Sequence, residues 1–138
     1  MVITDFSNDM VETTRSVIGN KDNVKYEVMD IQDISFENKT FDIVIANMLL
    51  HHVNNINKAI SEVNRVLKKG GIFYCSTFGE NGVVDYLASL FKDEINQNLE
   101  NKTFTLQNGK TYLNSRLKTN FIFGVCLFLY LGENCRSL

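Results

Sequence analysis

The 138-residue chain has no proline, few cysteines and no excess of basic residues. Average usage of about 5% would supply roughly seven prolines, but their absence excludes no function. The net charge is −2, from 14 basic and 16 acidic residues. Because a nucleic-acid-binding surface usually shows a strong basic excess or stripe, we expect no nucleic-acid partner.

Metal-ligand spacing and long apolar runs are also missing. The three cysteines, Cys75, Cys126 and Cys135, are widely separated, and one is left over after any pairing. We therefore expect neither a disulfide framework nor a metal site, and a reducing cytoplasm is the natural location. The longest apolar run, residues 121–131, is shorter than the about 20 residues that span a bilayer, and the N-terminus shows no secretory pattern. We expect no membrane segment.

The composition that is present is ordinary for a globular protein, with 44% hydrophobic and 22% charged residues. The length fits one domain, residues 1–138, with its own core. Short β-rich runs alternate with helical patterns along the chain. This alternation predicts an α/β fold with a mostly parallel sheet and flanking crossover helices.

Four strands are expected, at residues 2–4, 24–29, 41–46 and 72–77. The third is nearly all apolar, which is typical of a strand buried on both faces. Between the first two strands, we expect Ser7 to cap a helix that ends at Gly19-Asn20.

The clearest helical periodicity follows the third strand. Its apolar positions are Ile56, Ala59, Ile60, Val63, Val66 and Leu67. We expect Gly70-Gly71 to end this helix and residues 83–91 to form another. Residues 93–138 show no clear pattern. We expect a short strand at residues 104–106 with a turn at Asn108-Gly109, and a strand or buried segment at residues 121–131.

Three polar residues occupy the carboxyl ends of expected strands: Asp5, Asp30 and Asn47. Ligands of open parallel sheets bind outside these ends. One carboxylate can accept hydrogen bonds from both hydroxyls of a ribose, and a second acid can accept one from an adenine amino group. An Asp at a strand end is also a common turn residue. Recurrence at equivalent strand ends favours a nucleoside site.

Four segments together carry a family resemblance. They are VITDFSNDM at residues 2–10, VMDI at 28–31, FDIVIANMLLHHV at 41–53 and EVNRVLKKGG at 62–71. In this order and spacing they resemble the class I (Rossmann-like) S-adenosylmethionine-dependent methyltransferases of the ubiquinone/menaquinone-type small-molecule branch. Residues 1–92 form the family-like core, in which Lys69 replaces a frequent proline.

The resemblance implies S-adenosylmethionine as cofactor and a small molecule as methyl acceptor. It places Asp5 at the ribose, Phe6 and Met10 against the adenine, Asp30 at the adenine amino group, the Ile31 backbone beside it, and Asn47 and Met48 at the methionine end. For Phe6 and Met10, plain core packing is the alternative.

His51 and His52 are the candidates for a catalytic role. A neutral imidazole near the acceptor can take its proton as general base. Alternatively, a His at a strand-to-helix turn satisfies local backbone groups.

The family's first strand and glycine-rich loop precede the ribose-binding acid by about 20 residues. Only four residues precede Asp5. We therefore expect a truncated chain that lacks this strand and leaves open edges on its neighbours. Losing about four buried apolar side chains, at about 1.5–3 kcal/mol each, would remove much of the stability of a domain. A homo-oligomer or strand exchange with a partner chain would fill the gap.

Three functions stay open at this point. The first is methyl transfer to a small molecule by the full-length form. The second is a non-catalytic truncated remnant, or a subunit completed by a partner chain. The third is a nicotinamide-dependent oxidoreductase, although Tyr86 is followed four positions later by Leu90 rather than by the Lys of a Tyr-x-x-x-Lys pair. The acceptor is not specified, and residues 117–138 read either as a divergent last strand or as a frameshifted tail.

Overall fold

A computed structural model describes residues 1–79, 103–118 and 120–125 of the chain. Its elements are β1 (Val2–Asp5), α1 (Asn8–Ile18), β2 (Lys25–Val28), β3 (Phe41–Asn47), the 3-10 helix η1 (Leu50–His52), α2 (Ile56–Val66), β4 (Leu67–Thr77), α4 (Leu106–Arg116) and β5 (Asn120–Val125). The expected α/β fold is confirmed. In these residues, no helix has the length and apolar character needed to cross a membrane.

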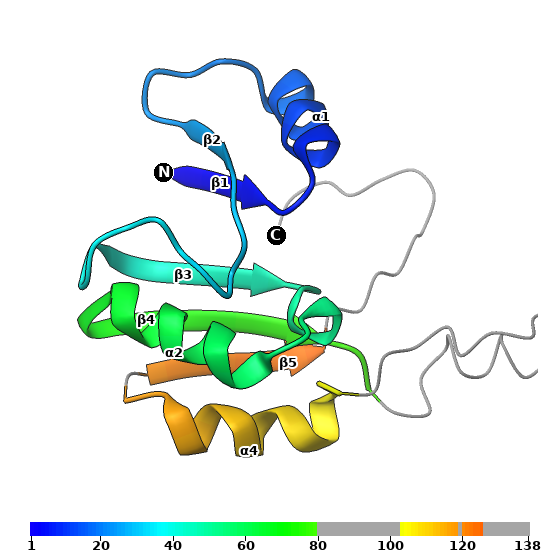
Figure 1. Ribbon diagram of the computed structural model, residues 1–138, viewed down its shortest axis with the longest axis vertical. Helices are drawn as coiled ribbons and strands as arrows, with labels where there is room; N and C mark the ends of the chain where they lie inside the picture. Colours follow the sequence, from blue (N-terminus) through cyan, green and yellow to red (C-terminus); the bar gives the residue numbers. More distant parts are fainter. Residues whose placement is uncertain (80–102, 119, 126–138) are drawn as a thin grey trace, which may run out of the picture.

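The strands form two parallel sheets, β1–β2 and β3–β4–β5. Figure 1 shows the two sheets one above the other, with β1 facing β3 and with the arrowheads of β1, β3 and β5 pointing to the same side. Among the described residues, β1 and β3 each have a hydrogen-bonded neighbour on one side only. Two open strand edges therefore face each other between the sheets.

Helix α1 begins and ends where the sequence predicts. Ser7 occupies the N-cap position in an extended conformation, but its side chain does not make the expected capping hydrogen bond. Gly19 ends the helix at φ 82°, with its N–H donating to the Arg15 carbonyl at 2.8 Å. Glycine adopts this left-handed backbone without the penalty of a Cβ. The helix nevertheless buries little, because Val11 is the one buried residue within residues 1–28.

The main core lies between α2 and one face of the β3–β5 sheet. The predicted apolar face of α2 is confirmed, since Ala59, Ile60 and Val63 are fully buried. They join Ala46 of β3 and Phe73 of β4 in one cluster. At about 1.5–3 kcal/mol for each large apolar side chain, this face accounts for most of the burial that stabilises the fold.

The predicted helix end at Gly70-Gly71 is wrong, because α2 already ends at Val66 and β4 begins at Leu67. The carbonyls of Arg65 and Val66 accept hydrogen bonds from the amides of Lys39 and Thr40, at 2.9 and 2.8 Å. These bonds attach the end of the helix to the segment before β3. Gly70, at φ 82°, then lies within an irregularity in the pairing of β4 with β3.

The predicted strand at residues 104–106 and turn at Asn108-Gly109 are also wrong. Thr105 and Asn108 form a capping box that starts α4, so both residues belong to a helix N-terminus. A Cβ on Gly109 would lie 2.5 Å from Phe123 Cζ, so this glycine permits close packing of α4. Strand β5 confirms part of the expectation for residues 121–131, whereas the predicted helix at 83–91 lies outside the described residues.

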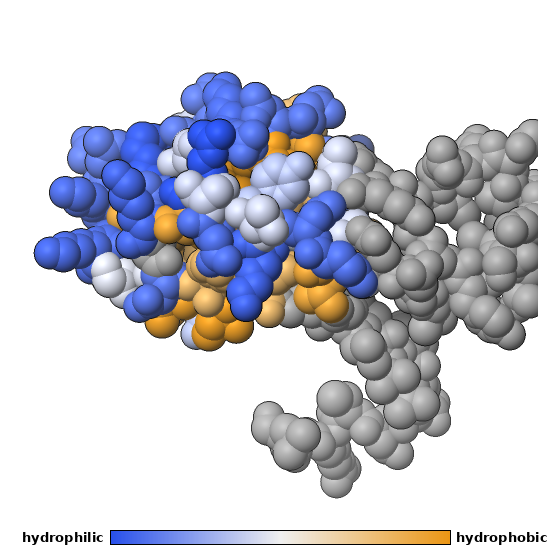
Figure 2. Space-filling model, turned by 90° about the horizontal axis from the view of Figure 1, so that it is seen from below, coloured by the Kyte–Doolittle hydropathy of each residue, from blue (hydrophilic) through white to orange (hydrophobic). Residues whose placement is uncertain are grey.

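Strand β3 is not buried on both faces within the described residues, contrary to its apolar sequence. Ile43 is 52% exposed and Ile45 is 71% exposed, and Ile122 of β5 lies in register with Ile45 on the same face. Figure 2, which views the molecule from below, shows hydrophobic residues gathered along its lower edge. The sheet therefore has one face packed against helices and one apolar face that the described residues leave open.

Candidate functional site

Asp5 and Asp30 lie at the same end of one sheet. Asp5 is the last residue of β1 and pairs in register with Val28, the last residue of β2. The Met29 N–H donates to the Asp5 carbonyl at 2.9 Å, and Asp30 follows directly. The structure thus brings together the two acids that the sequence predicted to act together.

Both carboxylates also make local turns. Asp5 Oδ1 accepts the Ser7 N–H at 2.8 Å, and Asp30 Oδ1 accepts the Gln32 N–H at 2.8 Å. These are the turn contacts that an Asp at a strand end commonly makes. A carboxylate offers about four lone-pair sites. Asp5 with this one bond, and Asp30 with this bond and two longer ones from Gln32 Nε2 at 3.3 Å, therefore keep capacity for a ligand hydroxyl or amine. The two acids therefore fit the adenosine part of a nucleoside cofactor.

Phe6 and Met10 follow Asp5 and are largely exposed, at 76% and 52%. The alternative that these side chains are core residues is wrong in the described structure. An exposed aromatic ring and thioether beside a carboxylate offer an apolar surface for a flat ring. Ile31 differs, because it is half-buried and packs against the main core.

Asn47 and Met48 form the carboxyl end of β3, together with Ser76 of β4. Met48 has a φ of 51°, which is uncommon for a residue other than glycine. Its N–H donates to the hydroxyl oxygen and the carbonyl of Ser76, at 3.1 and 3.2 Å. The Ser76 hydroxyl in turn donates to Asn47 Oδ1. Sequence reasoning missed Ser76, although its place at the end of the adjacent strand was a usable signal.

The predicted cofactor residues share one edge of the molecule. In Figure 1, β1 and β3 point to the same side, so their carboxyl ends carry Asp5 and Asn47 on that side. Asp42 lies instead at the amino end of β3, where its carboxylate pairs with Lys68 at 2.8 Å. Asp42 therefore lies apart from the candidate site.

His51 and His52 lie side by side in η1 but in different environments. His51 is 2% exposed and contacts the rings of His52 and Phe78, with centroids 4.0 and 4.4 Å apart. Burial, and then the neighbouring His52, lowers the pKa of His51 to about 4. Neither of its ring nitrogens has a hydrogen-bond partner in the described part of the chain. His51 is therefore neutral near pH 7 and a weak base, whereas His52 is exposed.

Other reactive groups are few in the described residues. There, no group of three or more His, Cys, Asp or Glu side chains could hold a metal ion. Cys75 is a buried free thiol, and burial raises its pKa to about 12. A thiol with so high a pKa carries almost no thiolate at neutral pH and is a poor nucleophile.

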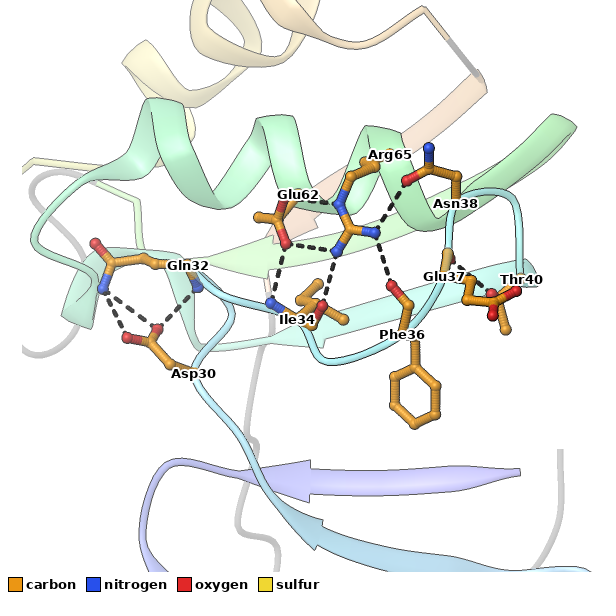
Figure 3. A network of polar contacts seen from close by, with 9 residues as sticks. All are labelled: Asp30, Gln32, Ile34, Phe36, Glu37, Asn38, Thr40, Glu62 and Arg65. Carbon is orange, nitrogen blue, oxygen red and sulfur yellow. Dashed lines mark hydrogen bonds and ion pairs between the residues drawn. The ribbon is translucent and has the colours of Figure 1, made fainter.

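A polar network fastens the segment after Asp30 to helix α2 (Figure 3). The Arg65 guanidinium donates to the carbonyls of Ile34 and Phe36, both at 2.7 Å, to Asn38 Oδ1 at 3.1 Å and to the Glu62 carboxylate at 2.8 and 2.7 Å. Glu62 also accepts the Ile34 N–H at 3.0 Å. The hydrogen bond from Arg65 lowers the pKa of Glu62, and the same contact raises the pKa of Arg65. Sequence reasoning did not predict this network.

Comparisons with known proteins match this chain to methyltransferases. The family described as "Methyltransferase domain" matches residues 1–75. A demethylmenaquinone methyltransferase of Leptospira interrogans is 40% identical over 73 residues, which are 50% of this chain and 29% of the relative. A SAM-dependent methyltransferase of Thermotoga maritima has the same fold, with a TM-score of 0.66, 16% identity, and 83% of this chain and 53% of that chain covered.

A third similar protein is the trans-methyltransferase CalH in complex with SAH. It has a TM-score of 0.55 and 25% identity, with 63% of this chain and 25% of that chain covered. The chain spans only about three tenths of the length of the curated relatives it matches. The family match covers more than half of the chain, and the fold is Rossmann-like. The chain therefore belongs to the methyltransferase domain family.

Proposed function

We propose that the whole protein transfers a methyl group from S-adenosylmethionine to a small-molecule acceptor. The observation that carries this proposal is the pair Asp5 and Asp30 at adjacent strand ends, in a chain of the methyltransferase domain family. The family match favours methyl transfer over the nicotinamide-dependent oxidoreductase that the sequence left open.

The described residues supply groups for each part of the cofactor. Asp5 would accept hydrogen bonds from the ribose hydroxyls, and Asp30 would accept one from the adenine amino group. The exposed side chains of Phe6 and Met10 would pack against the adenine ring. Asn47 and Met48 would line the methionine end, where the Ser76 contacts fix the backbone. When bound, the cofactor supplies an electrophilic methyl group on a sulfonium.

The contribution of this chain to the reaction is mainly positioning. Holding an acceptor in line with a reactive methyl group converts a bimolecular step into an effectively unimolecular one. The low pKa of His51 makes it a poor general base, and His52, which is exposed, is the better placed of the two to take a proton. We assign neither His a required catalytic role.

The acceptor that we propose is a quinone-type small molecule. The Leptospira relative is named as a demethylmenaquinone methyltransferase, and the methyltransferase-domain match over residues 1–75 includes both acids of the candidate site. The other partner predictions stay part of the proposal: no nucleic acid and no membrane, with a cytoplasmic location that rests on the cysteine pattern of the sequence.

A second candidate is a subunit completed by another strand, from a second copy or from a partner chain. Among the described residues, β1 and β3 each have one unpaired edge, and this favours the candidate because unpaired edges are templates for strand addition. Light scattering after size-exclusion chromatography tests this candidate. A dimer that dissociates on dilution supports exchange between copies, whereas a monomer at all concentrations contradicts that exchange and leaves only a strand from a different chain.

Calorimetric titration with S-adenosylhomocysteine tests the cofactor site. We expect Asp5→Asn and Asp30→Asn each to weaken binding about tenfold or more, because a hydrogen bond to a charged group contributes about 1.5–3 kcal/mol. Asp42→Asn is the matched control, since Asp42 lies at the opposite end of β3 and should leave affinity unchanged. No detectable binding by the folded wild-type chain would favour the non-catalytic remnant instead.

A further inference from the structure

The segment between β2 and β3 is attached along its length to a helix of the other sheet. This connecting segment, residues 29–40, leaves the β1–β2 sheet after Asp30 and then runs beside α2 (Figure 3). Two separate sets of hydrogen bonds hold it there. One involves Gln32, and the other involves Arg65 with Glu62.

Gln32 connects the Asp30 carboxylate directly to the start of α2. Its Nε2 donates to both oxygens of Asp30 at 3.3 Å, and its Oε1 accepts the Asn55 N–H at 2.9 Å. Asn55 is the N-cap residue of α2, and its own side chain accepts the Lys58 N–H at 3.0 Å. One side-chain amide therefore bridges the candidate adenine contact and a capped helix end.

Arg65 holds the rest of the connecting segment. It is three residues from Glu62 on α2, and the pair is partly buried, with side-chain exposures of 32% and 19%. Its guanidinium donates to the carbonyls of Ile34 and Phe36, both at 2.7 Å. Charge-assisted hydrogen bonds of this kind are stronger than neutral ones, and the planar guanidinium fixes several directions at once.

The β1–β2 region has few buried side chains of its own that could hold Asp30 in a fixed position. Val11 is the one buried residue within residues 1–28, whereas α2 packs on the main core. We propose that α2 positions the Asp30 carboxylate for the adenine amino group, with Arg65 and Gln32 as positioning residues. This inference rests on the proposed function, because it names the residues that set the nucleobase selectivity of that site.

Selectivity between two nucleobases distinguishes positioning from simple stabilisation. An aligned carboxylate at the adenine edge prefers an amino group, which donates a hydrogen bond, to an oxo group, which only accepts. We expect the wild-type chain to bind S-adenosylhomocysteine about tenfold more tightly than S-inosylhomocysteine. Loss of alignment should reduce this preference even where the variant stays folded.

The experiment compares Arg65→Gln and Gln32→Met with Lys68→Gln. Lys68→Gln is the matched control. Like Arg65→Gln, it removes a positive charge from an ion pair, but the acid that it leaves unpaired is the exposed Asp42. We expect Arg65→Gln and Gln32→Met to lower the preference for the adenine ligand to about twofold or less, and Lys68→Gln to keep it. Amide hydrogen exchange should quicken at residues 31–38 in Arg65→Gln and stay unchanged in the control.

The outcomes separate the two proposals. If the wild-type chain binds with a preference that Arg65→Gln and Gln32→Met both retain, the positioning inference is wrong while the cofactor site stands. If the folded wild-type chain binds neither ligand, the proposed function fails and this inference with it. Gln32→Met removes no charge, so it keeps the test decisive if Arg65→Gln does not fold.

Discussion

The two sheets of this molecule differ in how they are stabilised. The β3–β4–β5 sheet packs one face against α2 and α4 around a continuous core that includes Ile60, Phe73 and Phe104. The β1–β2 sheet and α1 bury Val11 and leave Phe6, Met10 and Val17 more than half exposed. Yet the second region carries both acids of the candidate cofactor site. The β1–β2 region, which carries the candidate site, therefore depends on contacts with the rest of the molecule for its position.

This difference fits a general division between core and site. Burial of apolar area supplies most of the stability of a fold, whereas binding groups need exposed, unsatisfied hydrogen-bonding capacity. The hydrogen bonds of Gln32 and Arg65 connect the two regions. They attach the Asp30 carboxylate and the segment after it to α2, which packs on the main core.

Removing a large side chain from the core of the β3–β5 sheet should have the largest effect. Phe73 is fully buried, so we expect Phe73→Ala to lower the free energy of unfolding by about 3–5 kcal/mol in urea denaturation. Val17 is 80% exposed, and Val17→Ala should change the free energy of unfolding by no more than about 0.5 kcal/mol. Equal losses from the two variants would contradict the contrast between the regions.

Hydrogen exchange should report the same contrast without a mutation. We expect the paired amides of β2 to exchange at least about tenfold faster than those of β4 after correction for intrinsic rates, because local opening is easiest where few apolar contacts are lost. Nuclear magnetic resonance of the wild-type chain measures both sets at once. Equal protection would show that the β1–β2 sheet opens only with the whole molecule.

The buried His51 should make stability depend on pH. Its pKa is about 4 in the folded chain and about 6.5 when exposed, so the unfolded chain binds more protons between these values. Stability should therefore be complete above pH 6.5 and fall as the pH drops toward 4. His51→Phe should flatten this dependence in denaturant titrations at several pH values, while His52→Gln should retain it. A wild-type chain whose stability rises over this fall in pH would refute the assignment.

The smallest effect is expected at the exposed pair Asp42 and Lys68, whose side chains are 78% and 46% exposed. Surface ion pairs contribute about 0–1 kcal/mol, so Lys68→Met should lower stability by no more than that. Adding salt should reduce the difference further, because exposed charges are screened. A larger loss that persists in high salt would mean that Lys68 packs against the fold through its aliphatic part.

The sequence alone predicted the features that depend on neighbouring residues. Ser7 and Gly19 mark the ends of α1, and the apolar spacing of α2 selects the face that becomes buried. The sequence could predict that Asp5 and Asp30 lie at strand ends, because a strand and the turn after it are both indicated by neighbouring residues. The cofactor roles of these acids, and of Asn47 and Met48, remain predictions.

Features that depend on residues far apart in the chain became visible in the folded structure alone. Arg65 bonds to a segment about thirty positions earlier, between 27 and 31 residues away, and no local pattern indicates that pairing. Asn108-Gly109 looked like a turn, but packing against Phe104 and Phe123 keeps it within a helix. Ile43 and Ile45 looked buried, but exposure depends on what covers a face. Local patterns fix backbone preferences, whereas contacts between distant segments fix burial, and burial decides which groups are free to bind.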